Sequence, residues 1–447
     1  MTSLITLNSN RIYHIFLVLF VSLLVGALVV LTVFPYTVKR NSGLPKISIS
    51  LNEASIDEIH NESKTIKYPN NSLALTENNY TFLFDNVEIK GRGNYTWSEP
   101  KRPYQIKLDS SYSFLGMEKG KKWILLTNHL DDSHLRNWLA FDINKNISSD
   151  YPLRGEFAEL KIDDSELGLY FVTNKISINK NSIDLRDSYG ILVELDNTYC
   201  FDEDVQYRVS SGDCLALKHA VSDDLAKDSF DVFVKDFDEM ELAAKNGDYD
   251  RVKQLLDVNS MAEYYLVSEI TSNPDAYVTS FYFYKDGVDD LIHVGPGWDF
   301  DGAFGNIKWE EGNRDDDFYS PETLMARRKF AFGGTEFDDE NNQYVEIVPS
   351  DYISKLGYYL IDIPEFYELV CEKYRATVEG KGDLFAEKID EEASYIRMSA
   401  IKDNNMWEKD DFDSAVAYLK DWIKRRVDYL DSVFGNRIKI NRDYHLL

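Results

Sequence analysis

The alternation of hydrophobic and polar residues changes along the chain and divides it into two parts. Seven segments between residues 46 and 195 alternate at every second position or form short apolar runs, which is the pattern of β-strands. We predict strands over residues 46–51, 80–84, 104–108, 122–126, 157–162, 168–172 and 191–195. One segment between them, residues 132–143, carries apolar residues at helical spacing. The first part is therefore predicted to be rich in β-structure.

Beyond about residue 220, apolar residues recur at helical spacing. We predict helices over residues 230–245, 260–270, 353–363, 364–377 and 415–434. Two short strands, 280–285 and 291–294, interrupt them and are joined by a turn at 286–290. The pattern predicts an α+β chain with a β-rich N-terminal lobe (46–219) and a helical C-terminal lobe (220–447) that holds an acidic hairpin.

An apolar run without any charge extends from residue 15 to residue 34. About 20 such residues suffice to cross a bilayer, and the residues after the run form a poor cleavage site for a signal peptide. We predict a short N-terminal tail (1–13), a single-pass transmembrane anchor (14–36) and a tether (37–45). The flanking charges barely decide the orientation. A short tail before a large domain favours export, so we expect the body on the extracytoplasmic side of the membrane.

The net charge of the chain is −28. This acidity argues against a nucleic-acid partner, because phosphate backbones require a basic face. The three cysteines have no metal-binding spacing. Cys200 and Cys214 flank a hairpin-like stretch, where a disulfide in an exported body and two unpaired thiols are equally compatible with the sequence.

Two aspartates, Asp299 and Asp301, lie in a glycine-flanked turn directly after the predicted strand 291–294, and Asp275 follows the predicted helix 260–270. Metal-dependent phosphoryl transfer uses this order, with one carboxylate for the attacking group and a later one for Mg²⁺. A carboxylate beside Trp298 and Phe300 needs a cation, and a metal ion would supply one. A plain acidic turn remains an alternative. A glycosidase pair is another, although its defining carboxyl separation is not contained in the sequence.

Basic residues precede this turn in an otherwise acidic chain. Arg92 lies between two glycines after a strand, where backbone N–H groups and a guanidinium can approach phosphate oxygens. An exposed arginine in a β-turn fits the same spacing. Lys107 lies within a predicted strand and points either to solvent or to a phosphate in a cleft.

Seven segments, taken in order, resemble the spore-coat protein H (CotH) kinase family. They are KGRGNYTW, KRPYQIKLD, FLGMEKGKKWILLTNHLDDSHLRNWLAFDI, GLYFVTNKI, ILVELD, SEITSNPDAYVTSFYFYKD and GPGWDFDGAFGN, which together extend from about residue 90 to residue 306. The resemblance implies an atypical protein-kinase-like, two-lobed fold. It also implies binding of ATP and Mg²⁺ and phosphorylation of Ser or Thr in protein substrates.

The resemblance assigns roles to individual residues. Asp275 matches the catalytic aspartate of the family, and Asp299 matches its metal-binding aspartate. Asp301 and Ser280 are implied as further metal ligands. The cofactor-binding residues implied in the same way are Arg92, Asn94, Lys107 and Lys175. Glu194 and Lys218 occupy family-like positions without an assigned role.

Two positions depart from the expected family pattern. Ser280 stands where an Asp-x₄-Asn pattern has its asparagine, and a hydroxyl is a poorer Mg²⁺ ligand than an amide carbonyl. Asn174 precedes Lys175 where Thr-Glu-Lys is expected. If that glutamate normally pairs with a lysine, its replacement weakens or abolishes activity.

The leading hypothesis is a membrane-anchored kinase that transfers the γ-phosphate of ATP to Ser or Thr of cell-surface or coat proteins, with Mg²⁺. The alternative is a protein of the same fold that binds or assembles partners at the surface without catalysis, because ATP is scarce outside the cell. A carbohydrate-active enzyme of the cell surface is a third hypothesis.

Overall fold

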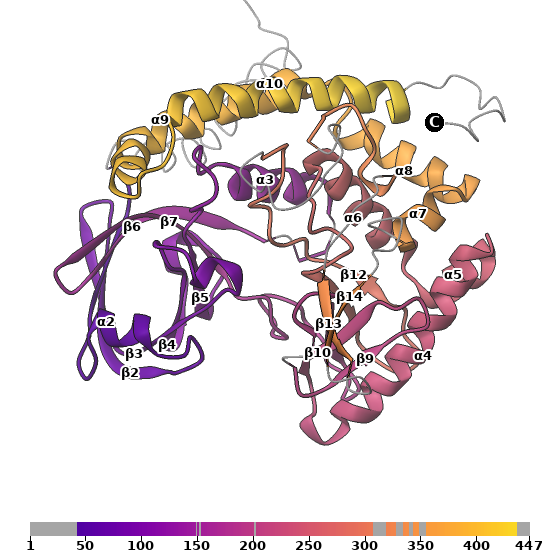
Figure 1. The fold of residues 1–447 in the computed structure, drawn as a ribbon, viewed down its shortest axis with the longest axis horizontal. Helices are drawn as coiled ribbons and strands as arrows, with labels where there is room; N and C mark the ends of the chain where they lie inside the picture. Colours follow the sequence, from indigo (N-terminus) through magenta and orange to yellow (C-terminus); the bar gives the residue numbers. More distant parts are fainter. Residues whose placement is uncertain are drawn as a thin grey trace, which may run out of the picture.

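Seven strands in the first part of the chain form a closed barrel, shown in indigo and purple in Figure 1. The computed structural model describes residues 43–148, 150–151, 153–200, 203–306, 319–327, 334–338, 343–347 and 355–435. The barrel order is β1-β2-β3-β4-β5-β7-β6, and β1 closes it by pairing in parallel with β6. Its strands are β1 (Lys46–Ser50), β2 (Tyr68–Glu77), β3 (Tyr80–Gly91), β4 (Tyr104–Tyr112), β5 (Gly120–Leu126), β6 (Gly155–Ile162) and β7 (Ser165–Asn174).

Alternation along these strands places their two sets of side chains in two different cores. Residues such as Ile47, Ile89 and Trp123 point inward and fill the barrel. Ile124 and Phe171 point outward and join the core of the second part of the molecule. The helix α2 (Ile56–Asn61) begins with a capping box and contributes Ile59 to the barrel core. Two short 3₁₀ turns follow strands of the barrel, η1 (Tyr95–Trp97) and η2 (Phe114–Gly116).

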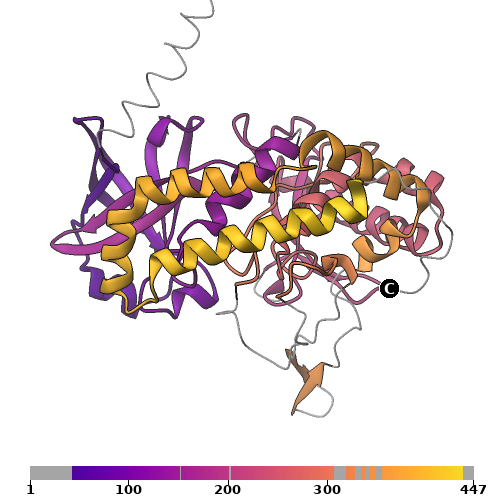
Figure 2. The same ribbon diagram turned by 90° about the horizontal axis from the view of Figure 1, so that it is seen from above.

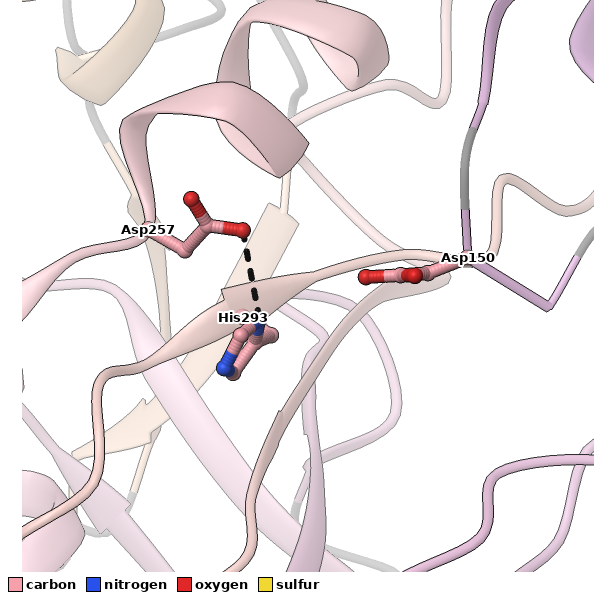
Figure 3. A group of neighbouring side chains, drawn as sticks. All are labelled: Asp150, Asp257 and His293. Carbon is pink, nitrogen blue, oxygen red and sulfur yellow. Dashed lines mark ion pairs between the residues drawn. The ribbon is translucent and has the colours of Figure 1, made fainter.

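The second part is built on a five-stranded antiparallel sheet of order β12-β11-β8-β10-β9. Its strands are β8 (Ile191–Leu195), β9 (Gln206–Arg208), β10 (Cys214–Ala220), β11 (Phe281–Lys285) and β12 (His293–Val294). A separate two-stranded sheet consists of β13 (Gly334–Asp338) and β14 (Gln343–Ile347). The strand β12 is fastened to the start of α6, because His293 Nδ1 lies 3.3 Å from Asp257 Oδ2 (Figure 3).

Helices pack against this sheet and share one large core with it. They are α3 (Arg136–Ile147), α4 (Ala226–Lys245), α5 (Tyr249–Leu255), α6 (Val258–Thr271), α7 (Lys355–Ile361), α8 (Pro364–Thr377), α9 (Gly382–Met406) and α10 (Phe412–Leu430). Shorter turns are η4 (Asp223–Leu225), η6 (Met325–Arg327) and the π-helical η7 (Asp431–Gly435). The long helices α9 and α10 run side by side across both parts of the molecule (Figure 2).

The prediction of an atypical kinase-like, two-lobed fold is wrong. The N-terminal body is a closed seven-stranded barrel, and the second body combines its own sheet with helices. Alternation predicts strands but not whether their sheet closes, since closure depends on pairing between β1 and β6, more than a hundred residues apart. In the part of the chain that the structure describes, no helix has the length and apolarity needed to cross a membrane. The tail 1–13, the predicted transmembrane span 14–36 and most of the tether lie outside the described residues.

A buried ion pair joins the barrel to α9. The Asp403 carboxylate accepts hydrogen bonds from Lys101 Nζ and from the Leu169 amide, each at 2.7 Å. The side chains of Lys101 and Asp403 are both fully buried. Gly168, with φ of 84°, leaves room for this contact, because a Cβ there would come within 2.1 Å of Asp403 Oδ1. The carboxylate on α9 thus holds strand β7 and the Lys101 loop in place.

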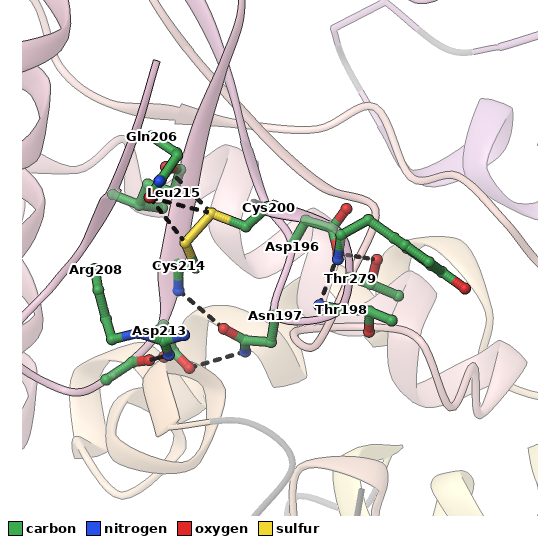
Figure 4. The surroundings of a disulfide bond; sticks show 12 residues. Asp196, Asn197, Thr198, Cys200, Gln206, Arg208, Asp213, Cys214, Leu215 and Thr279 are labelled. Atoms are coloured by element: carbon green, nitrogen blue, oxygen red, sulfur yellow. Dashed lines mark hydrogen bonds between the residues drawn. A yellow bond between two sulfur atoms is a disulfide. The ribbon is translucent and has the colours of Figure 1, made fainter. Parts of the chain in front are cut away.

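Cys200 and Cys214 form a disulfide beside the second sheet (Figure 4), which answers the question that the sequence left open. Cys214 lies on β10, and its amide donates to Asn197 Oδ1 at 2.9 Å. The neighbouring Asp196 accepts the Thr279 hydroxyl at 2.8 Å. The disulfide therefore joins the loop after β8 to β10, and the start of this loop hydrogen-bonds to the segment after α6. Cys371 is buried and unpaired.

Candidate functional site

The turn after β12 that contains Asp299 and Asp301, called the acidic turn here, is held by two asparagines from different segments of the chain. Asn273, after the end of α6, donates its side-chain amide to the carbonyl of Asp299 at 2.9 Å. Asn137, in α3, accepts the Phe300 amide at 3.1 Å and donates to the Asp301 carboxylate at 2.6 Å. Asp299 itself has a left-handed φ of 61°. These contacts fix the backbone that presents the carboxylates of Asp299 and Asp301.

The carboxylates of this turn lie in surroundings that disfavour their negative charge. Burial, followed by the charges of Asp299 and Asp131, raises the pKa of Asp301 to about 7, against the hydrogen bond from Asn137. Burial also raises the pKa of Asp299, while Arg92 and a hydrogen bond from the Ser280 hydroxyl lower it. Among the described residues, neither carboxylate takes part in a salt bridge. Two desolvated carboxylates of this kind fit a divalent cation such as Mg²⁺, which takes oxygen ligands.

Asp275 is tied to the acidic turn through one residue. Asn273 Oδ1 accepts the Asp275 amide at 3.3 Å, and the side-chain nitrogen of the same asparagine donates to the Asp299 carbonyl. The Asp275 carbonyl accepts the amides of Val278 and Thr279, each at 3.1 Å, so the segment forms a tight turn. Asp275 is buried and close enough to Tyr264 to help raise the pKa of that phenol, after the larger effect of burial. The two predicted aspartates are therefore neighbours in one constellation.

A cationic group, defined here as Lys90, Arg92, Lys122, Lys175 and Lys218, adjoins the acidic turn through Arg92. Burial lowers the pKa of Arg92, while Tyr282, Asp299, Glu194 and Asp301 raise it, which places Arg92 beside both carboxylates of the turn. The guanidinium also lies over the Trp298 ring, 5.2 Å from its centroid. Strands β3 and β5 and the end of β7 bring most of this group from the barrel, and β10 adds Lys218.

The members of the cationic group repel one another. Burial, followed by the charges of Lys122, Lys90, Arg92 and Lys218, lowers the pKa of Lys175 to about 8. Burial, followed by Lys175, Lys122 and Lys218, lowers the pKa of His219 to about 4. Among the residues that the structure describes, Lys218 is the member of the group that carboxylates pair closely, with Glu194 Oε2 at 2.9 Å and a second contact to Glu203. An excess of positive charge beside desolvated carboxylates suits a ligand that carries several negative charges and a metal ion.

The structure brings most of the residues predicted from the sequence together. Arg92 and Ser280 contact or electrostatically influence Asp299, and Lys175 adjoins Arg92. Two predicted cofactor-binding residues, Lys107 and Asn94, make no hydrogen bond or ion pair with the acidic turn among the described residues. Lys107 is exposed on β4, opposite Glu88 and Lys122. Asn94 is exposed, and its side chain accepts a hydrogen bond from Lys64.

Several residues of the site could not be predicted from the spacing of residue types along the sequence. Asn137 and Asn273 are buried asparagines next to Arg136 and Pro274, and polar residues inside otherwise apolar segments were the available clue. Lys90, Lys122 and His219 alternate with buried strand residues and so resemble ordinary exposed side chains. Asn174 turns toward Glu118, whose carbonyl lies 3.5 Å from its amide. A lysine–glutamate pair is nevertheless present in the site, between Lys218 and Glu194.

A comparison with known protein families finds a match over a large part of the chain. The family profile described as CotH kinase protein matches residues 89–430, which is more than half of the chain and includes every residue of the acidic turn and of the cationic group. A search of curated proteins finds no match. The ordered segments and the profile agree, and the chain belongs to the CotH kinase protein family.

Proposed function

We propose that this protein is a phosphotransferase that moves the γ-phosphate of ATP to Ser or Thr of a protein acceptor, with Mg²⁺. The observation that carries the proposal is the apposition of the two desolvated carboxylates, Asp299 and Asp301, with the cationic group around Arg92 and Lys175. A metal–triphosphate complex matches both halves, because its metal takes carboxylate ligands and its phosphates take cations.

In the proposed mechanism, Asp299 and Asp301 would hold Mg²⁺, and Arg92 and Lys175 would neutralise the phosphate oxygens. Bound Mg²⁺ would supply stabilisation of the charge that develops on the transferring phosphoryl group. Asp275 orients the acceptor hydroxyl and takes its proton. The hydroxyl oxygen forms a bond to the γ-phosphorus as the bond to the β-phosphate oxygen breaks, and ADP leaves. Asn273 sets the position of Asp275 relative to Asp299.

A protein of this family without catalysis is the second candidate, and Ser280 is the observation that favours it. The Ser280 hydroxyl hydrogen-bonds the Asp299 carboxylate instead of offering an amide oxygen to a metal ion. Such a protein would serve as a surface binding or assembly module. Metal-dependent ATP binding without transfer to any acceptor is the result expected for a protein of this second kind.

We propose an extracytoplasmic location for the body of the protein. The Cys200–Cys214 disulfide supports this location, because structural disulfides persist mainly in oxidising compartments. The membrane anchor over residues 14–36 stays a prediction from the sequence. Cleavage of the body by a protease added to intact cells would test the location.

The experiment that tests the function measures binding and transfer separately. The purified full chain is heated with Mg²⁺ and ATP, with ATP and a chelator, and with adenosine. ATP at a hundred times its dissociation constant stabilises a protein by about 2.7 kcal/mol, so a rise in Tm is expected only with Mg²⁺ and ATP. Labelled γ-phosphate is then followed onto Ser or Thr of the chain itself and of added surface proteins. No metal-dependent rise in Tm would contradict the proposal.

The affinity for ATP is expected to fall as the pH rises through about 8 toward 10. The pKa of Lys175 is about 8 because burial and then Lys122, Lys90, Arg92 and Lys218 disfavour its charged form. Below this pH the ammonium form predominates and attracts phosphate. Above this pH the side chain is a neutral amine and no longer offers a charged donor. Losing one charge-assisted hydrogen bond corresponds to roughly a tenfold loss of affinity.

This pH dependence is measured by titrating ATP and Mg²⁺ into the protein at several pH values. Lys175→Gln is expected to bind weakly at every pH and to flatten the profile between pH 7 and 10. Lys180→Gln is the matched control, because Lys180 is exposed and lies five residues further along. An unchanged pH profile in Lys175→Gln would show that Lys175 does not contact phosphate.

A further inference from the structure

A second group of ligand-type side chains lies away from the acidic turn. Asp150 follows α3, Asp257 caps the start of α6, and His293 lies on β12. One ligand atom from each residue lies within 4.8 Å of the other two (Figure 3). Three segments that are distant in sequence therefore converge on one point, which the candidate phosphotransferase mechanism does not use.

Each of these side chains is oriented by a neighbour. The Asp257 carboxylate accepts the amides of Asn259 at 3.1 Å and Ser260 at 3.4 Å. The His293 ring stacks on Tyr284, with centroids 5.0 Å apart and an interplanar angle of 9°. The Tyr284 hydroxyl donates to Asp150 Oδ2 at 3.3 Å. Oriented ligands of this kind resemble the supported ligands of metal sites.

The imidazole is the informative member of the group. Its Nδ1 is buried and lies 3.3 Å from Asp257 Oδ2, with which it forms an ion pair. Its other nitrogen, Nε2, lies 3.9 Å from the Oδ2 atom of Asp290, a carboxylate outside the group of three. A histidine that turns one nitrogen to a metal ion and the other to a carboxylate is a common arrangement in metal sites.

The spacing of the three ligands is close to that of a metal centre. Ligands at about 2.1 Å from one ion lie about 3 to 4.2 Å from each other. The atoms of the group lie within 4.8 Å of one another, so the widest pair needs to close by at most about 1.4 Å to reach the separation of about 3.4 Å in a tetrahedral site. Asp150 is exposed, so a rotation of its side chain can supply this movement.

We propose that Asp150, Asp257 and His293 bind a divalent transition-metal ion, of the Zn²⁺ or Mn²⁺ class. Imidazole nitrogen together with two carboxylates favours these ions over Mg²⁺, which prefers oxygen ligands alone. The ion would join the start of α6 to β12, the strand that leads into the Asp299 turn. This site is distinct from the Mg²⁺ site proposed for phosphate transfer and does not depend on it.

The test is a titration of Zn²⁺ and, separately, of Mn²⁺ into the metal-free full chain by calorimetry. It is carried out in the Asp299→Asn/Asp301→Asn variant, so that binding at the acidic turn does not contribute. One ion per chain is expected, and Mg²⁺ is expected to bind far more weakly. Asp150→Asn and His293→Gln are each expected to weaken binding by about tenfold or more. Asp289→Asn, an exposed change in the turn before β12, is expected to leave binding unchanged.

Two results would overturn the proposal: no binding of either ion at micromolar concentrations, or equal affinity in the parent and Asp150→Asn proteins. Either would mean that His293 and Asp257 only form an ion pair that fastens β12 to α6. Asp150 lies in an exposed segment, so its substitution is expected to leave the fold intact, as a circular-dichroism melt of the metal-free proteins will show. Because the readout is metal binding, its failure would leave the proposed phosphotransferase activity untouched.

Discussion

Asp299→Asn is expected to reduce metal-dependent phosphate transfer by about 10²- to 10⁴-fold, the range found for essential catalytic groups. The substitution preserves the shape of the side chain and removes the negative charge that would hold Mg²⁺. The backbone contacts of the turn, from Asn273 to the Asp299 carbonyl and from the Phe300 amide to Asn137, do not involve this carboxylate. The loss should therefore come from metal binding, and the metal-dependent rise in Tm with ATP should be lost with it.

Asp275→Asn separates the two roles in the same experiment. It is expected to lose transfer to a similar extent but to keep the rise in Tm with Mg²⁺ and ATP, because Asp275 is proposed to handle the acceptor hydroxyl. Asp289→Asn is the matched control, an exposed aspartate in the turn before β12. Full transfer by Asp299→Asn would remove this residue from the mechanism, and loss of ATP binding in Asp275→Asn would reassign its role.

Lys101→Met is expected to lower the free energy of unfolding by about 3–5 kcal/mol, because it leaves a buried carboxylate without its partner. Asp403 would retain the Leu169 amide at 2.7 Å but lose the ammonium. Its second oxygen already lacks a hydrogen bond and lies 3.6 Å from His134 Nε2. Lys101 Nζ also donates to the Thr127 carbonyl at 3.1 Å, so that carbonyl loses a donor too.

Chemical denaturation of the full chain measures this effect. The double variant Lys101→Met/Asp403→Leu is expected to recover part of the loss, since no charge then stays buried and unpaired. Asp383→Asn is the control, because it breaks the exposed pair with Lys424 and should change stability little. A small effect of Lys101→Met would mean that water or His134 stabilises the charge of the Asp403 carboxylate in place of Lys101.

Local pattern was sufficient to locate most elements. The strands predicted at 46–51, 122–126 and 191–195 correspond to β1, β5 and β8, and the helix predicted at 415–434 corresponds to α10. In these segments the buried positions follow the period of the element, so local sequence and tertiary packing agree. The resemblance to the CotH family, carried by the order of seven segments, is also confirmed.

Elements whose apolar pattern is weak were not predicted. In α9, small residues such as Ala393 and Ala400 alternate with larger ones on the buried face, while Leu384 and Met398 are exposed. In β2, polar residues occupy the first positions before the alternation begins at Leu73. Closure of the barrel could not be derived either, because the pairing of β1 with β6 leaves no local trace.

The residues of the candidate site also fall into those that the sequence predicts and those that it does not. The aspartates were predicted because they lie in glycine- and proline-rich turns, where charged residues stand out from their surroundings. The lysines of the cationic group lie on strands, and alternation alone does not distinguish a side chain that faces solvent from one that faces another body of the protein. Lys107 and Lys122 occupy opposed positions on neighbouring strands, yet Lys107 is exposed, whereas Lys122 is partly buried and close enough to Lys175 to lower its pKa.

The position of β1 between β2 and β6 has a mechanical consequence. A force that pulls the N-terminus along the direction of β1 loads two rows of hydrogen bonds at once, because the strand is paired along both edges. Bonds loaded in this way share the force and resist it together, whereas a strand at a free edge would peel away one bond at a time. The barrel is therefore expected to resist unfolding by a force that is applied through its first strand, β1.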